Sequence, residues 1–181
     1  MGTVHVQYSI LIGLFIENND SLVPKKIMEN VVSVSVGNSH TMAIKDDGSL
    51  WGFGHNWMLT IGDGQGEGKF EDFRVSPVKI MDNVSAVSAG GSDTMAIRDD
   101  GSLWAWGGLA GIIGEGLRVH HSTPIWIMDD VLAVSAQGEM TLIAKIDGSL
   151  WGAKNYFVKV DDETPINKQN FVRLFEKIKL H

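Results

Sequence analysis

The chain has no cysteine, and only four prolines and two tyrosines occur among its 181 residues. Without cysteine the protein can form no disulfide, no zinc–thiolate site and no cysteine nucleophile. Basic residues are in the minority, 15 against 22 acidic ones, which gives a formal net charge of −7. Because binding to a phosphate backbone requires clustered Lys and Arg, we expect no nucleic acid among the partners.

Long apolar runs are also missing. The apolar stretch from Ser9 to Ile16 is shorter than the about 20 residues that a transmembrane helix requires, so we expect no membrane span. The stretch lacks the basic start and small-residue cleavage site of a signal peptide. Apolar residues occupy every second position from Val4 to Ile16. Residues 1–23 are therefore predicted to be an N-terminal strand, with a degenerate leader as the alternative.

Glycine is abundant, with 21 residues, and much of it belongs to a sequence that occurs three times. The copies are VVSVSVGNSHTMAIKDDGSLWGFG from Val31, VSAVSAGGSDTMAIRDDGSLWAWG from Val84 and VLAVSAQGEMTLIAKIDGSLWG from Val131. A proline and an Ile-Met pair precede each copy, and equivalent tryptophans are 53 and 47 residues apart. A period of roughly 40–50 residues with strand-like content is typical of β-propeller blades.

Each copy divides into short strands. Val31–Val36 and His40–Lys45 alternate apolar and polar residues, as half-buried strands do. The Asp-Asp-Gly sequence that follows predicts a hairpin with a primed turn, in which glycine adopts positive φ without strain. Ser49–Phe53 is the third predicted strand. Pro24–Met28 is the predicted fourth, with proline at the strand start, where no ladder bond is lost.

The predicted fold is therefore all-β: a partial β-propeller of three four-stranded blades with a short C-terminal helix. The expected repeats are 24–76, 77–123 and 124–160, followed by a helical tail, 161–181. Within this tail, apolar residues at helical spacing and Pro165 at a first helical position predict a helix over Pro165–Lys179. The structural core of the repeats is expected to comprise buried tryptophans and turn glycines: Trp51, Trp104, Trp151, Gly48, Gly101 and Gly148.

The triplicated pattern resembles the regulator-of-chromosome-condensation repeat. The motif Val-x-x-Val-x-x-Gly-x-x-His-Thr-x-Ala-Ile, then Asp-Gly-x-Leu-Trp-x-x-Gly, runs here from Val31 to Gly54. Asn56 and Ile61–Gly64 match part of the family's continuation. The resemblance covers about residues 24 to 155 and implies a β-propeller, usually of seven blades. It is strongest to bacterial members, which implies a secreted or cell-surface location.

The family includes promoters of guanine-nucleotide exchange and bacterial inhibitors of β-lactamases, but no residue here matches either activity. The motif histidine is His40 in the first copy and is replaced by Asp93 and Met140 in the others. Because the repeat tolerates this loss, we expect His40 to make a structural hydrogen bond rather than to act in catalysis. The Asp-Asp-Gly sequences are likewise interpreted as turns rather than as paired catalytic carboxylates.

The glycine-rich segment Gly62–Gly68 has the composition of a phosphate loop but not its parallel βαβ context. Asp63 and Glu67 could supply oxygen ligands to calcium, but a flexible surface loop is the favoured interpretation. His120 and His121 are adjacent, and in a strand they would point to opposite faces, so we place them in a loop. No metal site and no cofactor are predicted.

We expect a non-enzymatic module that binds protein or glycan through the segments that vary between copies, 54–76 and 107–123. The candidate binding residues are Trp57, Asp63, Glu67, Trp106, His120 and His121. One alternative is an incomplete propeller fragment without a function of its own. Another is a propeller-based hydrolase or carbohydrate-active enzyme, which would require a converging polar cluster.

Three blades are too few for a usual ring and leave two open flanks. The Pro165–Lys179 helix and the Val4–Ile16 strand, both apolar on one face, are expected to cover these flanks. The alternatives are association with another copy to complete a ring, or instability of the isolated chain.

Overall fold

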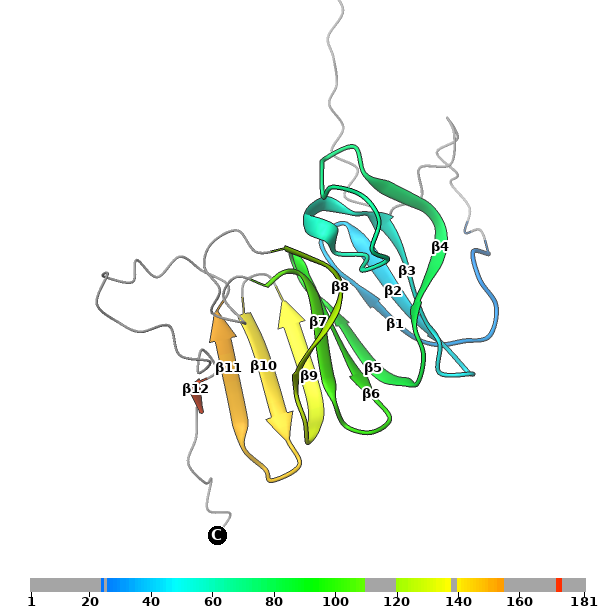
Figure 1. The fold of residues 1–181 in the computed structure, drawn as a ribbon. Helices are drawn as coiled ribbons and strands as arrows, with labels where there is room; N and C mark the ends of the chain where they lie inside the picture. The colour runs from blue at the N-terminus through cyan, green and yellow to red at the C-terminus, as the bar shows by residue number, and fades with distance from the viewer. Residues whose placement is uncertain (1–23, 25, 110–119, 138–139, 155–171, 174–181) are drawn as a thin grey trace, which may run out of the picture.

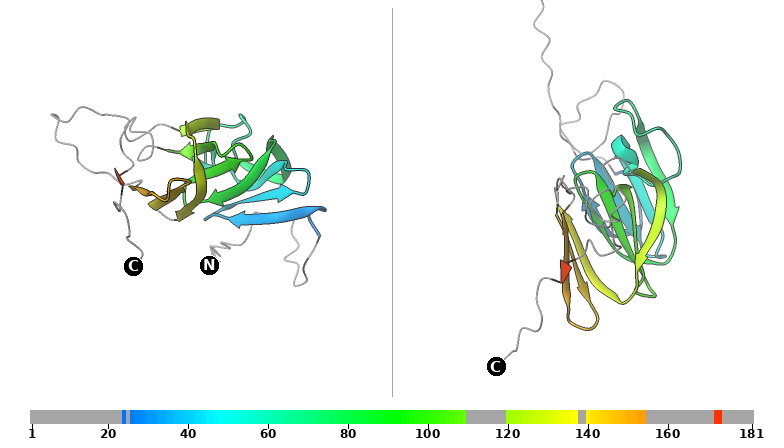
Figure 2. Two further views of the ribbon diagram at one scale, coloured as in Figure 1. Left: turned by 90° about the horizontal axis from the view of Figure 1, so that it is seen from below. Right: turned by 60° about the vertical axis from the view of Figure 1, so that its left-hand side comes forward.

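The computed structural model describes residues 24, 26–109, 120–137, 140–154 and 172–173, and the fold is given for these residues (Figure 1). They form three antiparallel sheets, each with its four strands in chain order. The sheets stand side by side as three blades of an incomplete propeller (Figures 1 and 2), which confirms the predicted all-β class.

The blades are defined by their strands. Blade 1 contains β1 (Val31–Val36), β2 (His40–Lys45), β3 (Leu50–His55) and β4 (Phe73–Met81), with the short 3-10 helix η1 (Trp57–Leu59) after β3. Blade 2 contains β5 (Val84–Ala89), β6 (Asp93–Arg98), β7 (Leu103–Gly108) and β8 (His120–Met128). Blade 3 contains β9 (Val131–Gln137), β10 (Met140–Lys145), β11 (Leu150–Lys154) and β12 (Val172–Arg173).

The proline segment of each repeat closes the sheet of the preceding repeat. β4 contains Pro77 and pairs with β3, because consecutive antiparallel strands pair directly and β3 offers the free edge. The prediction that Pro24–Met28 supplies the fourth strand of blade 1 is therefore wrong, and the described residues of that segment form no strand. Sheet boundaries are thus offset from the expected repeat boundaries. Pro77 lies at a register shift in an outer strand, where its missing N–H costs no ladder bond.

The fourth strand of blade 3 comes from the C-terminal part of the chain. β12 pairs with Trp151 and Gly152 of β11, the same sheet positions at which β4 pairs with β3 in blade 1. The predicted helix is therefore wrong at Val172–Arg173, where sheet pairing takes precedence over helical spacing. The rest of the predicted helix, and the predicted strand or leader at 1–23, lie outside the described residues. Within the described ranges, no helix has the length and apolar character needed to cross a membrane.

The Asp-Gly hairpins form as predicted, but their turn type differs. Lys45 N donates to Ser49 O (3.0 Å) and Gly48 N donates to Lys45 O (3.0 Å), which encloses a three-residue loop. Gly48 alone in this loop has positive φ (76°), and its equivalents Gly101 and Gly148 both have φ of 80°. This is the three-residue hairpin that ends in a left-handed glycine, not the two-residue primed turn.

A side-chain relay ties each turn to the recurring tryptophan. Asp47 Oδ1 accepts hydrogen bonds from Ser49 N (2.9 Å) and Ser49 Oγ (2.5 Å), and Trp51 Nε1 donates to Ser49 Oγ (2.8 Å). The hydrogen bond from the Ser49 hydroxyl lowers the pKa of Asp47. The same three contacts recur at Asp100–Ser102–Trp104 and Asp147–Ser149–Trp151. The repeated Asp-Gly-Ser-Leu-Trp sequence therefore encodes one turn structure.

The recurring tryptophans are equivalent in position but are not the buried core that the sequence predicts. Trp51, Trp104 and Trp151 are only half-buried, and each indole N–H donates to the serine of its turn. Of the three, Trp151 packs against the edge of a core cluster. Cationic groups lie over two of the rings, 5.4 Å from the ring centroid for Lys45 Nζ and 5.9 Å for the Arg98 guanidinium.

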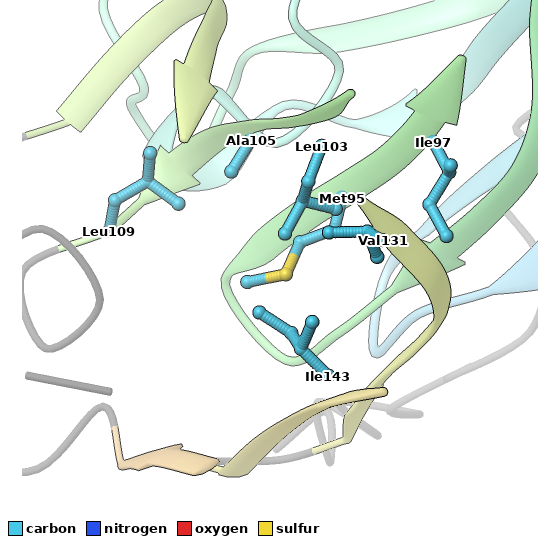
Figure 3. Close-up of a cluster of buried hydrophobic side chains, with 7 residues drawn as sticks. All are labelled: Met95, Ile97, Leu103, Ala105, Leu109, Val131 and Ile143. Carbon is cyan, nitrogen blue, oxygen red and sulfur yellow. The ribbon is translucent and has the colours of Figure 1, made fainter. Parts of the chain in front are cut away.

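The hydrophobic core lies between blades. One cluster joins Met42, Ile44 and Leu50 of blade 1 to residues of blade 2, namely Val84, Ala89, Ala96 and Trp106. A second joins Met95, Ile97, Leu103, Ala105 and Leu109 from blade 2 to Val131 and Ile143 of blade 3 (Figure 3). Each sheet therefore buries its apolar face only where it meets a neighbouring sheet.

Trp106 and Trp104 lie two residues apart in β7, and their substitution separates the two roles of tryptophan. We expect Trp106→Ala, which empties a fully buried site, to lower the free energy of unfolding by about 3–5 kcal/mol. Trp104→Ala removes a half-buried ring and one hydrogen bond and should cost about 1–2 kcal/mol. Urea unfolding followed by circular dichroism measures both values. Equal losses would contradict this division of the core.

Candidate functional site

The segment 56–72, which connects β3 to β4 and is called here the β3–β4 loop, extends from blade 1 to blade 2 (Figure 1). Its helix η1 contacts both β7 and β8. Gly64 N donates to Ser122 O in β8 (2.8 Å). The loop is therefore supported by two blades rather than by one.

Asn56, which is fully buried, holds the loop together from its first residue. Its Nδ2 donates to Gln65 O (3.0 Å) and to Asp72 Oδ2 (2.9 Å), while its Oδ1 accepts from Ile61 N (3.0 Å). Its backbone N–H donates to Asp72 O (2.7 Å). Asn56 thus fixes the beginning, the middle and the end of the loop relative to one another.

A second polar contact closes the loop at the start of β4. The Arg74 guanidinium pairs with Asp72 (Nη1 to Oδ1, 2.6 Å) and with both carboxylate oxygens of Asp63. The hydrogen bonds to Asp63, more than those to Asp72, raise the pKa of Arg74 against the opposing effect of burial.

These contacts bear on the calcium alternative. Asp63 Oδ1 also accepts from Gln65 N (3.0 Å), so its carboxylate is engaged inside the loop. Glu67 is exposed and pairs with Lys69. Across the described residues, no three His, Asp or Glu side chains gather in a way that could hold a metal ion. Asp63 is thus a structural residue of a surface loop fixed by hydrogen bonds, whereas the sequence favoured a flexible one.

The loop is also bonded to the interior of blade 2. Thr60 O accepts from Trp106 Nε1 (2.9 Å) and from Thr94 Oγ1 (2.8 Å). Gly62 has φ of +84°, and a Cβ at this position would lie 2.4 Å from Trp106 Nε1. Only glycine therefore allows the loop to close over the indole ring.

His40 completes this inter-blade network. Its Nε2 lies 2.8 Å from Thr94 Oγ1, and the Thr94 hydroxyl proton is already given to Thr60 O. Nε2 must therefore carry the imidazole proton, and Nδ1 has no partner among the described residues. Burial lowers the pKa of His40 from 6.5 to about 4, so the ring is neutral at pH 7. The predicted structural hydrogen bond is confirmed.

Aromatic side chains remain on the outside of the loop. His55 stacks on Phe73 (ring centroids 4.6 Å apart) and meets the edge of Phe70 (5.1 Å), while its Nε2 contacts Phe70 O (2.7 Å). Phe70, Phe73 and Trp57 are all exposed. We call these three side chains, two from the loop and Phe73 from the start of β4, the aromatic loop surface.

The structure separates the residues that the sequence proposed for binding. Trp57 is exposed on η1, as expected of an anchor residue. Trp106 is fully buried under the loop, so the prediction that it binds a partner at the surface is wrong. His120 and His121 lie in β8 and not in a loop: His120 is exposed, whereas the buried His121 Nε2 has no partner among the described residues. Most of the second variable segment, residues 110–119, lies outside the described residues.

Sequence reasoning missed Phe70 and Phe73. Phe70 is an aromatic residue of a variable segment, which is the signal that singled out Trp57. Phe73 lies in β4, whose counterpart in blade 2 is β8, and gave no such signal. Arg74 gave no comparable signal, because its two partners become neighbours only when the loop closes.

Comparisons with known proteins agree with the repeat pattern. The family model for the regulator of chromosome condensation (RCC1) repeat matches residues 31–65. The human regulator of chromosome condensation is 35% identical over 92 residues, which cover 49% of this chain and 21% of the relative. The chain thus spans about a fifth of the length of such curated relatives.

Solved structures agree on the fold. Human WBSCR16 has a TM-score of 0.61 at 24% identity, covering 77% of this chain and 38% of that one. Prp20p from Saccharomyces cerevisiae has a TM-score of 0.58 at 19% identity, covering 72% and 32%. At these identities the likeness establishes the propeller fold alone.

The neutral state of His40 predicts a pH dependence of stability. Between pH 6.5 and about 4 the unfolded chain binds a proton at this histidine and the folded chain does not. Acidification through this window should therefore lower the free energy of unfolding, by up to about 3 kcal/mol in total. His40→Gln, whose amide can still reach Thr94, should lack this component. Urea unfolding of both proteins at several pH values tests it, and identical pH profiles would contradict it.

Proposed function

Because the repeats of this chain are RCC1-like and stack as propeller blades, we propose that it is a non-catalytic protein-interaction module that binds through the aromatic loop surface. The observation that carries this proposal is the contrast within one loop. Its polar groups Asn56, Asp63 and Asp72 are used to fix the backbone, whereas its aromatic side chains are directed to solvent.

A fixed loop is favourable for binding, because a surface that is already ordered loses little conformational entropy when a partner docks. Exposed aromatic residues supply large apolar contact area, and tryptophan is enriched among the residues that dominate interface energetics. Trp57 is well placed for this role. It lies on η1, which is supported by β7 and β8, and not on an unsupported loop tip.

The acid–base groups that recur at repeat positions have structural roles among the described residues, which supports the non-catalytic part of the proposal. His40 is neutral, buried and hydrogen-bonded to Thr94. Asp47 and Asp100 accept the hydrogen bonds that define their turns. A general acid or base must reach the proton that it transfers, and these groups are bonded within the scaffold.

A protein is favoured over a glycan as the partner. The yeast structure is titled for the binding properties of Prp20p to Gsp1p and histones, both of them proteins. Glu71 adds an exposed carboxylate to a loop whose Glu67 is paired with Lys69, and the chain as a whole carries a charge of −7. The partner surface that fits is an apolar depression with a basic rim.

The proposal is tested by placing a photo-crosslinking amino acid at Phe70 and identifying the captured protein by mass spectrometry. Binding of that purified protein is then measured by calorimetry. Trp57→Ala and Phe70→Ala should each weaken binding about tenfold or more, since truncation of a central aromatic anchor costs more than about 1–2 kcal/mol.

Trp126 provides the matched control, because it is an exposed tryptophan of blade 2 outside the loop. Trp126→Ala should leave the affinity unchanged. The proposal is wrong if the affinity survives Trp57→Ala and Phe70→Ala together, or if Trp126→Ala weakens binding equally. Binding of purified oligosaccharides that depends on Trp57, with no protein captured at Phe70, would instead establish the glycan alternative.

A further inference from the structure

Two open hollows lie at the end of the sheets that carries the Asp-Gly hairpins, opposite the end that carries η1 (Figure 1). One, of about 420 Å³, lies between blades 1 and 2, and the other, of about 270 Å³, lies between blades 2 and 3. Ser85 and Asp99 of blade 2 line both, so the hollows form one continuous groove, called here the hairpin groove. We propose that the hairpin groove binds an extended protein segment in which a single Arg or Lys is flanked by apolar residues. The proposal is independent of the aromatic loop surface.

In each Asp-Asp-Gly turn, the second aspartate is used by the scaffold. Its carboxylate accepts the serine hydrogen bonds that shape the turn, at Asp47 and at Asp100. These hydrogen bonds lower the pKa of each carboxyl, and the basic residue before the turn, Lys45 or Arg98, lowers it further. The third copy keeps the same aspartate as Asp147. The two cations are therefore directed to the second aspartates and to the adjacent tryptophan rings.

The first aspartate of each turn is not needed by the scaffold. The backbone N–H groups of Asp46 and Asp99 are held by hydrogen bonds of 2.9 Å, and both side chains are exposed. Among the described residues, neither carboxylate forms an ion pair. The third copy has Ile146 at this position and keeps the same backbone hydrogen bond (2.9 Å). The turn thus forms without this carboxylate, which leaves Asp46 and Asp99 available to a partner.

Apolar side chains border the hairpin groove on both sides of Asp99. Val32 of blade 1 is 66% exposed, and Leu132 and Ile146 of blade 3 are 69% and 66% exposed. Ser85 occupies in blade 2 the position of Val32 and Leu132, so the scaffold also accepts a polar residue there. The floor of the two hollows includes buried core residues, namely Ile44, Val84, Ile97 and Val131. Along its length the groove is therefore apolar, acidic and then apolar again.

This order of side chains defines the chemistry of the occupant. An exposed carboxylate without an ion pair attracts a cation, and the net charge of −7 also favours a basic partner. Sheets pack about 10 Å apart, and an extended chain rises about 3.3 Å per residue, so about three to four residues reach from one hollow to the other. A segment with apolar residues at positions i and i+4 and a basic residue at i+2 presents all three side chains on one face.

An NMR titration of the full chain with a designed peptide tests the proposal. The probe Ser-Leu-Ser-Arg-Ser-Leu-Ser should shift the amide signals of Ser85, Asp99 and Leu132 and leave that of Trp57 unchanged. Asp99→Asn should weaken binding about fivefold, because it removes the central charge. Leu132→Ser should also weaken binding about fivefold, because it removes apolar contact area.

Both substitutions should leave the fold intact, and circular dichroism checks this. Asp99 and Leu132 are exposed, and Leu132→Ser gives blade 3 the residue that blade 2 already has. Glu71→Gln is the matched control for Asp99→Asn, since it removes one exposed carboxylate at the opposite end of the sheets. Neither Glu71→Gln nor Trp57→Ala should change the affinity for the peptide.

Five outcomes would overturn the proposal. The first two are absence of binding and equal weakening by Asp99→Asn and Glu71→Gln, which would show attraction to the overall charge. Equal affinity for Ser-Ser-Ser-Arg-Ser-Ser-Ser would show that the groove makes no apolar contact. The same signal shifts with calcium alone would identify a cation site, and self-association that Leu132→Ser abolishes would identify a second copy as the occupant. Because the two variants alter different contacts, misfolding of one leaves the other decisive.

Discussion

Burial of apolar surface between sheets is the interaction on which this structure depends. Blades 1 and 2 each present a methionine, an isoleucine and a leucine on one side, and these side chains are covered by residues of the next blade. Met42, Ile44 and Leu50 are buried against blade 2, and their equivalents in blade 2 are buried against blade 3. No single sheet has two apolar layers of its own. The fold is therefore an assembly of repeats in which stability arises mainly at the interfaces.

The same dependence organises the surface. Trp106 belongs to blade 2, but its ring lies under the loop of blade 1, where Thr60 and Gly62 are shaped to receive it. The loop is fixed because the neighbouring blade is present. This is why its exposed aromatic residues have defined positions, and why a local feature of blade 1 would respond to mutations in blade 2.

The sequence was sufficient for the parts of the fold that follow local rules. The in-register repetition predicts three sheets, alternation predicts β1 and β2, and the Asp-Gly sequence predicts each hairpin. It was insufficient where the outcome depends on which of two neighbouring sheets a strand joins. The proline segment carries a strand pattern in every copy, and nothing local to it states that Pro77 joins the sheet before it. At Val172–Arg173, helical spacing was overridden by the open edge of β11.

The candidate site shows the same division. Trp57 was found because aromatic residues in a non-repeating segment are a local signal. Trp106 was misplaced because its burial depends on a loop 40-odd residues earlier in the chain, which the pattern of β7 does not encode. The recurring tryptophans were assigned to the core because they recur, whereas their recurrence reflects the serine to which each indole donates. Repetition identifies a structural role without stating which role it is.

Amide hydrogen exchange, resolved by residue, tests the central claim most directly. Val31, Val84 and Val131 occupy the same position in three blades, but only the last two donate their N–H groups to a preceding blade. If stability arises between blades, the amides of Val84 and Val131 exchange slowly and that of Val31 exchanges much faster. Equal protection of all three would show that each sheet is stable by itself and would contradict the account.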